Sequence, residues 1–164
     1  RESKKCLKNS LSLQHKLINL FGNEVTEGGK LILSKLALVA FKDKLSQKLL
    51  NGIMWPEVLL LINKAVEREQ KKKIKLFIVD AALIFEGHLD NILDSVLLIK
   101  TKDELRKQRA VRRKNISLSE IEKRMILQID EKKKETLADS IIQNDTTEEN
   151  LFKQLDNYYN KLIK

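Results

Sequence analysis

Three short apolar runs constrain the fold of this chain more than any other feature of its sequence. They cover residues 76–79, 95–99 and 140–142. Each run is rich in Ile and Val and too short for an independent helix, and long helical stretches separate the second run from the third. Continuous rather than alternating hydrophobicity is typical of strands buried on both faces, as in a parallel sheet between helices. The sequence therefore predicts an α/β fold.

The chain before the first of these runs predicts helices. Residues 8–21 carry apolar side chains at mostly helical spacing, and a glycine follows as a stop signal. Residues 31–41 and 45–53 predict two short helices. Proline is tolerated in the first turn of a helix, so a further helix is expected from Pro56 to about residue 69.

Composition limits the class of protein. At 164 residues and 42% hydrophobic content, the chain is expected to form one domain with one core. Cys6 is alone and His15 and His88 are far apart, so neither a disulfide framework nor a metal site is supported. No uninterrupted apolar stretch approaches the ~20 residues of a membrane span, and the first residues lack the apolar core of a signal peptide. We therefore expect a cytoplasmic protein without a membrane segment.

The net charge of +9 would attract any polyanion, including nucleic acid or a phosphorylated small molecule. Most of the excess is lysine scattered along predicted helices without interleaved aromatic side chains. Such a surface is more often a solvated face than a nucleic-acid groove. Nucleic-acid binding is the weaker alternative, and it stays open.

One glycine-rich stretch resembles the end of a phosphate-binding loop but does not match it. Gly28, Gly29 and Lys30 would need a glycine at position 24 and a Ser or Thr at position 31. These positions hold Glu24 and Leu31, so an ordinary turn is the better interpretation.

A cluster of arginines follows the second apolar run. Arg106, Arg109 and Arg113 have i, i+3 and i+7 spacing on a predicted helix, with Arg112 beside them. A guanidinium group can donate two parallel hydrogen bonds to the oxygens of one phosphate. This face therefore suits a polyphosphate whose charge is neutralised while a phosphoryl group is transferred. The spacing fits equally well with a solvated helix whose acids, at the start of the same stretch, act as counterions.

Two acids follow the first apolar run. Asp80 follows it directly. Glu86 lies six residues later, just before the glycine that ends the stretch VDAALIFEG. Ligands of open α/β sheets gather outside the carboxyl ends of the strands, where we expect both carboxylates to emerge. The alternative is that Asp80 caps the next turn and Glu86 is solvated.

Together these stretches resemble the dephospho-CoA kinases, P-loop kinases that use ATP to phosphorylate the ribose 3′-hydroxyl of dephospho-CoA. The resemblance rests on the order and separation of motifs along nearly the whole chain. FGNEV and LNGIMWPEV are similar to upstream segments of the family. The downstream motifs are Asp80-Ala-Ala-Leu-Ile-Phe-Glu86, the pair Arg109 and Arg113, Ser117 with Arg124-Met-Ile-Leu-Gln128, and Ala138-Asp-Ser-Ile-Ile-Gln-Asn144.

The resemblance implies a P-loop NTPase-like three-layer α/β/α fold with a parallel sheet, a helical substrate-binding insertion and a helical lid. It divides one domain, residues 1–164, into four regions. These are a substrate-binding region at about 8–70, core strands at 74–100, a lid at 101–137 and a C-terminal core at 138–164.

The resemblance also implies roles for six residues. Arg109 and Arg113 would neutralise the transferring phosphate as catalytic residues, and Asp80 and Glu86 would bind the acceptor substrate. The two remaining positions are Gln128, which would steady the lid, and Asn144, which would lie by the adenine. The implied ligands are ATP with Mg²⁺ and dephospho-CoA, and the implied state is a monomer or a weak oligomer.

The sequence departs from the family pattern in places. The family opens with a strand, a glycine-rich P-loop with its lysine, and a second strand, and nothing in these residues corresponds. We therefore expect the first strands to be absent and this chain to be inactive on its own. Leu33 and Trp55 stand where the family has Arg and His. Another nucleoside or nucleotide kinase of the P-loop superfamily and a basic nucleic-acid-binding module remain as alternatives.

Overall fold

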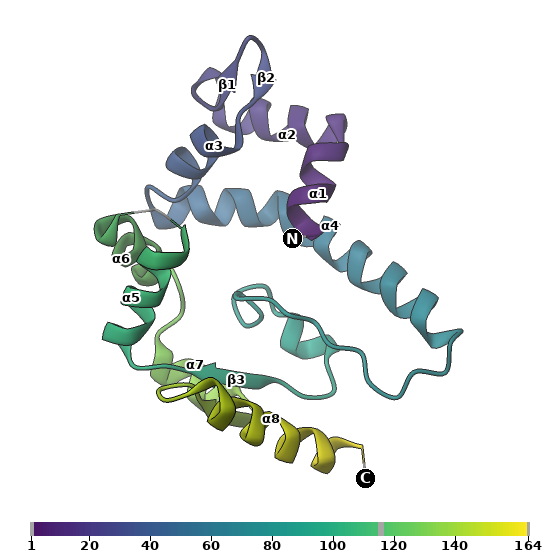
Figure 1. The fold of residues 1–164 in the computed structure, drawn as a ribbon. Helices are drawn as coiled ribbons and strands as arrows, with labels where there is room; N and C mark the ends of the chain where they lie inside the picture. The colour runs from purple at the N-terminus through teal and green to yellow at the C-terminus, as the bar shows by residue number, and fades with distance from the viewer. Residues whose placement is uncertain (1, 115–116, 164) are drawn as a thin grey trace. The chain divides into compact units, whose positions relative to one another are not determined.

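The computed structural model describes residues 2–114 and 117–163 (Figure 1). The expected lid, residues 101–137, therefore includes two positions, 115 and 116, outside the described part. The chain divides into two compact units, residues 1–79 and 80–164, and each is described by itself.

The first unit is mainly helical. Its elements are α1 (Glu2–Asn9), α2 (Leu11–Phe21), the 3-10 turn η1 (Asn23–Val25), β1 (Thr26–Glu27), β2 (Lys30–Leu31), α3 (Leu33–Ala40) and α4 (Lys44–Gln70). The strands β1 and β2 form a small antiparallel hairpin. Gly28 and Gly29 make its turn with φ of 55° and 73°, a left-handed backbone that favours glycine. This confirms the predicted turn.

The prediction of one helix over residues 8–21 is wrong at its start. The backbone is extended at Ser10, which separates α1 from α2, and the Ser10 hydroxyl accepts a hydrogen bond of 3.2 Å from the Leu13 amide. A side chain that caps a helix in this way competes with continuation of the preceding helix. The leucine spacing alone did not show this break.

The prediction that residues 45–53 and 56–69 form separate helices is also wrong, because both lie in α4. An interior proline removes a main-chain donor and its ring crowds the carbonyl one turn earlier, at a cost of about 3 kcal/mol or more, yet α4 continues through Pro56. By length and composition α4 is apolar enough to cross a membrane, and no part of its apolar window is fully buried, but a single helix of this kind is weak evidence of a membrane span. The sequence did not indicate this helix as a candidate, because charged and polar residues interrupt its apolar stretch.

The core of the first unit lies where α1, α2 and α3 meet the first half of α4. Its buried members are Leu7, Leu13, Leu17, Val25, Leu36 and Ala40, against which Leu50, Ile53 and Met54 of α4 pack. Leu13 and Leu17 lie one helical turn apart, so the same face of α2 buries both.

The second unit contains the parallel strands. Its elements are η2 (Leu89–Ile92), β3 (Leu97–Lys100), α5 (Asp103–Lys114), α6 (Leu118–Ile126), α7 (Glu131–Leu137), β4 (Ser140–Gln143) and α8 (Glu148–Leu162). The strands β3 and β4 pair in parallel, from Leu97 opposite Ser140 to Lys100 opposite Gln143. Helix α8 lies against β4. The two later apolar runs are thus confirmed as parallel strands, and so is the α/β class.

The first predicted strand, residues 76–79, is wrong. These residues have no regular secondary structure and belong to no ladder among the described residues, and Ile78 is 75% exposed. A strand is held by hydrogen bonds to a neighbour, and in the described sheets β3 pairs only with β4. Apolar composition alone therefore did not produce a strand here.

Candidate functional site

The site of the second unit lies where β3 and β4 end side by side. The Asn144 amide donates a hydrogen bond of 2.8 Å to the Lys100 carbonyl, which continues the ladder beyond the last paired residue. The Lys102 amide donates to Asp145 Oδ1 at 2.7 Å, and the Thr101 hydroxyl lies 3.4 Å from the Asn144 carbonyl. The loops that follow the two strands are therefore fastened to each other at the carboxyl edge.

Arg109 reaches this edge from α5. Its Nη1 donates a hydrogen bond of 2.7 Å to the main-chain carbonyl of Asn144, so the structure brings together two of the residues predicted for the site. A guanidinium has five N–H donors, and no described residue takes a second one from Arg109. One donor fixes the side chain, and the others are available to an anion.

Arg113 lies one helical turn further along α5. It is exposed, and no described residue forms an ion pair or hydrogen bond with its guanidinium. Residues four apart lie on the same face of a helix, so Arg109 and Arg113 share one face of α5. The predicted pair is confirmed as a helical pair, while its predicted catalytic role stays a prediction.

Arg106, unlike Arg109 and Arg113, has its guanidinium paired with carboxylates. Its Nη1 lies 2.6 Å from Glu131 Oε2, and its Nη2 lies 2.9 Å from Asp103 Oδ1. These bonds fasten α5 to the first residue of α7. For this member of the cluster, the counterion interpretation describes the structure better than a phosphate ligand does.

A further ion pair joins the two lid helices. Lys107 of α5 donates to Glu122 of α6 at 2.8 Å. The Glu122 carboxylate raises the pKa of Lys107, because it stabilises the charged ammonium. At the strand edge, Lys100 lies 2.7 Å from Glu135 of α7, and that hydrogen bond likewise raises the pKa of Lys100.

Helix α6 begins with a cap at Ser117. The Ser117 hydroxyl accepts from the Glu120 amide, and Glu120 Oε2 accepts from the Ser117 amide, both at 3.2 Å. This reciprocal capping box satisfies donors at the start of the helix. Ile121 of this helix is buried.

Glu86 is held inside the second unit. Its side chain is 11% exposed, and its Oε1 accepts from the Ile129 amide at 3.0 Å and lies 3.3 Å from Lys134 Nζ. Lys134 Nζ also donates to Gln128 Oε1 at 3.1 Å. The predicted residues Glu86 and Gln128 are thus brought together through a lysine. Glu86 is not the solvated side chain of the alternative interpretation.

Asp80 is exposed and forms no hydrogen bond or ion pair with a described residue. Its predicted role in acceptor binding therefore stays a prediction. The described residues also contain no group of three or more His, Cys, Asp or Glu side chains placed to hold a metal ion.

Sequence reasoning missed two residues of this unit. Lys134 stands within a run of three lysines and looks solvated, and no signal in the sequence distinguishes it from its two exposed neighbours. Asp139 Oδ2 accepts from the Val96 amide at 2.7 Å and fixes the start of β3 against the start of β4. Its position just before an apolar run was the available signal.

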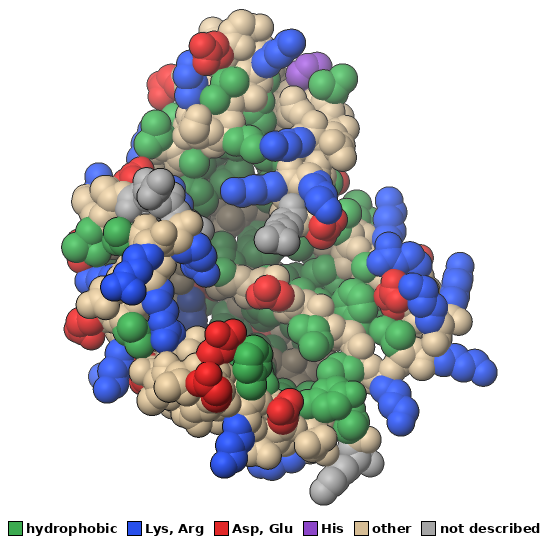
Figure 2. Space-filling view, in the orientation of Figure 1, with side chains coloured by type: hydrophobic (Ala, Val, Ile, Leu, Met, Phe, Trp, Pro, Cys, Tyr) green, Lys and Arg blue, Asp and Glu red, His purple; other side chains and the backbone are tan. Residues whose placement is uncertain are grey.

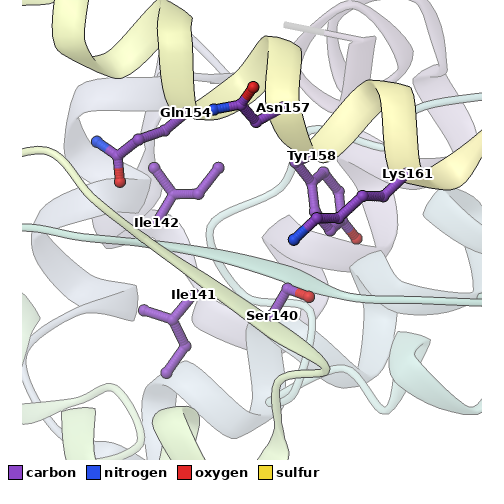
Figure 3. Close-up of a pocket in the computed structure, with 7 residues that line it drawn as sticks. All are labelled: Ser140, Ile141, Ile142, Gln154, Asn157, Tyr158 and Lys161. Carbon is purple, nitrogen blue, oxygen red and sulfur yellow. The ribbon is translucent and has the colours of Figure 1, made fainter.

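A cavity of about 280 Å³ lies between β4 and α8 (Figure 3). In Figure 3, Tyr158 and Lys161 extend from α8 toward the strand that carries Ser140. The Tyr158 hydroxyl lies 3.1 Å from Ser95 Oγ. None of the six predicted site residues lines this cavity, so it is separate from the candidate site.

The positive charge is spread widely. Figure 2 shows Lys and Arg side chains over many parts of the visible face, with groups over α5 and near the carboxyl end of α4. The scattered distribution agrees with the sequence expectation of solvated basic faces.

Comparison with known proteins gives a consistent result. The family model for dephospho-CoA kinase matches residues 3–150. The dephospho-CoA kinase of Fusobacterium nucleatum is 31% identical over 148 residues, 90% of this chain and 75% of that protein. The dephospho-CoA kinase of Listeria monocytogenes is 30% identical over 149 residues, 90% of this chain and 74% of that protein.

Solved structures agree with these matches. A crystal structure of a Thermus thermophilus protein has a TM-score of 0.71 at 25% identity, covering 99% of this chain and 81% of that one. The dephospho-CoA kinase from Campylobacter jejuni has a TM-score of 0.62 at 25% identity, covering 98% of this chain and 81% of that one. With the motif order, the paired strands and the anchored Arg109, these matches show that the chain belongs to the dephospho-CoA kinase family.

Proposed function

We propose that this protein transfers the γ-phosphoryl group of ATP to the ribose 3′-hydroxyl of dephospho-CoA, the last step of coenzyme A biosynthesis. Membership of the kinase family supports this proposal. The observation that carries it is Arg109, which is fixed to the Asn144 carbonyl at the carboxyl edge of the sheet and has donors left for phosphate. Ligands of open α/β sheets bind at this edge.

In this proposal the two arginines of α5 act on the nucleotide. Arg109 and Arg113 lie on one helical face, and their free donors fit the oxygens of a polyphosphate. They neutralise the charge that spreads over the transferring group, which is the main demand of phosphoryl transfer. Asn144, beside Arg109, lies next to the adenine, and Gln128 steadies the segment that follows α6.

On the acceptor side, we propose that Asp80 and Glu86 bind dephospho-CoA. Asp80 is exposed and free to accept a hydroxyl hydrogen bond. Glu86 has one oxygen engaged by Ile129, while its Oε2 is buried without a hydrogen-bond partner among the described residues. Mg²⁺ bound with ATP supplies charge neutralisation between the phosphates when it is present.

Residues 1–164 contain no sequence of the phosphate-binding-loop type. Positioning by that loop is a large part of catalysis in P-loop kinases. We therefore propose that this chain alone does not turn over, and kinase assays use the product of the complete reading frame. We also propose a cytoplasmic protein, monomeric or weakly oligomeric, which cell fractionation and light scattering would test.

The test is a coupled assay of ADP release with a panel of acceptors. Dephospho-CoA should give the highest kcat/KM, while adenosine and other nucleosides should give little ADP above background. If a different nucleoside or nucleotide is the best acceptor, the protein is another kinase of the same superfamily. If no acceptor stimulates ADP release, the proposed activity is wrong.

A further inference from the structure

A buried lysine lies at the base of the lid. Lys134 of α7 has a side chain that is 8% exposed, while Lys132 and Lys133 beside it are exposed. Burying an ammonium group is unfavourable unless it is paired and hydrogen-bonded. Lys134 meets this condition through two partners, so its burial is a specific arrangement rather than general packing.

The partners of Lys134 come from two different segments. Glu86 belongs to the loop before η2, and Gln128 belongs to the connection between α6 and α7. Glu86 also accepts from the Ile129 amide in that connection. Lys134 of α7 therefore contacts both the loop that carries Glu86 and the connection over residues 127–130.

The same helix holds the other side of the lid. Glu131, the first residue of α7, is the partner of Arg106 in α5. Glu131 and Lys134 are three residues apart and lie on one face of the helix. Helix α7 is thus the fixed element to which both the lid helix α5 and the connection after α6 are attached.

One atom of this cluster is unsatisfied. Glu86 Oε2 is buried and has no hydrogen-bond partner among the described residues. A buried acceptor without a donor lowers the stability of the folded protein. A donor that forms a hydrogen bond with it is therefore bound more favourably. Because Lys134 and Ile129 both hold the other oxygen, they determine where Oε2 is presented.

We propose that Lys134 is a positioning residue of the kinase. It acts through Glu86 and Gln128 without touching substrate: it fixes the connection over residues 127–130, and it orients the second carboxylate oxygen of Glu86. This inference rests on the proposed function for its kinetic part. Its structural part concerns the connection alone.

The kinetic test compares Lys134→Met, Lys134→Arg and the matched control Lys133→Met in the product of the complete reading frame. Residues that orient the direct ligands of a site typically contribute about tenfold or more to activity. By that analogy, Lys134→Met should lower kcat/KM for dephospho-CoA by about tenfold or more. Both kcat and the KM for ATP should change, as is common when a hinge is altered. Lys134→Arg should recover most of the loss because it keeps the charge and donors, and Lys133→Met should behave as wild type.

The structural test follows hydrogen exchange of the Ile129 amide in the same proteins. This amide should exchange faster in Lys134→Met and in Glu86→Gln than in Lys133→Met, because its acceptor is then poorly oriented or uncharged. If Lys134→Met does not fold, the comparison of Glu86→Gln with Lys133→Met tests the same contact, because Glu86 is the acceptor of the Ile129 amide. A wild-type protein inactive toward dephospho-CoA contradicts the proposed function, but it leaves the exchange result as a test of the connection.

Three results would overturn the positioning role. The first is wild-type kinetics in Lys134→Met. The second is an equal loss in Lys133→Met, which indicates a general effect of charge. The third is unchanged exchange of Ile129 together with no recovery in Lys134→Arg, which indicates that the lysine only fills space.

Discussion

The guanidinium of Arg109 donates a hydrogen bond of 2.7 Å to the main-chain carbonyl of Asn144, 35 residues further along the chain. This bond joins the lid helix α5 to the end of β4. A main-chain acceptor holds the arginine in place without neutralising it, so its positive charge remains available to phosphate.

Replacing both Arg109 and Arg113 by alanine should remove most of the turnover. Arginines that stabilise the charge of a transferring phosphoryl group contribute large factors, so kcat should fall by at least about a hundredfold. The measurement is steady-state ADP release at saturating dephospho-CoA. A Lys132→Ala, Lys133→Ala protein loses the same charge from exposed positions and should keep its kcat. Retained turnover in the arginine variant would contradict the lid assignment.

Replacing Asp139 by alanine should destabilise the paired strands. The Val96 amide would lose its carboxylate acceptor at 2.7 Å, which should lower the free energy of unfolding by about 1–2 kcal/mol. Urea denaturation measures this change, and Asp156→Ala, an exposed acid of α8, is the control. Equal stabilities of the two variants would show that the bond to Val96 is dispensable.

Replacing Leu17 by alanine should destabilise the first unit. Leu17 has no exposed surface, and truncation of a buried leucine typically costs about 2–5 kcal/mol. Leu11→Ala in the same helix removes the same atoms from a side chain that is 70% exposed, and its effect should be small. Thermal unfolding of Leu17→Ala and Leu11→Ala measures this difference. Equal melting temperatures of the two variants would contradict the assignment of Leu17 to the core.

The pair of Lys107 and Glu122 predicts a dependence on pH. Glu122 raises the pKa of Lys107 above its ordinary value of 10.5 in the folded protein. Stability from this pair is therefore fully present below the pKa of the unfolded chain and is lost as the pH rises through the raised pKa. The difference in Tm between wild type and Lys107→Gln should shrink as the pH rises above about 10.5. Lys123→Gln, at an exposed position of α6, should show no such trend.

The sequence predicted those parts of the fold that depend on local composition. Residues 95–99 and 140–142 became β3 and β4 because each run has a partner. Residues 76–79 have the same composition but no described partner, and composition does not show whether a neighbour is present. The break at Ser10 depends on a single capping side chain, which a leucine pattern does not reveal.

For the site, spacing predicted which arginines share a face but not what each one contacts. Arg106 looked equivalent to Arg109, yet it is paired with Glu131, which lies 25 residues away. The acceptor of Arg109 is a main-chain carbonyl, and no side-chain motif encodes such a partner. Lys134 was hidden because a run of three lysines is typical of a solvated helix, and only tertiary structure shows which of the three is buried.

The most direct test of the central claim identifies the product. The protein from the complete reading frame is incubated with ATP, Mg²⁺ and dephospho-CoA, and the products are separated by chromatography with mass detection. We predict one new compound that carries one added phosphate, co-elutes with authentic coenzyme A, and forms in step with ADP. Absence of this compound, or phosphate on a different hydroxyl, would contradict the assignment as a dephospho-CoA kinase.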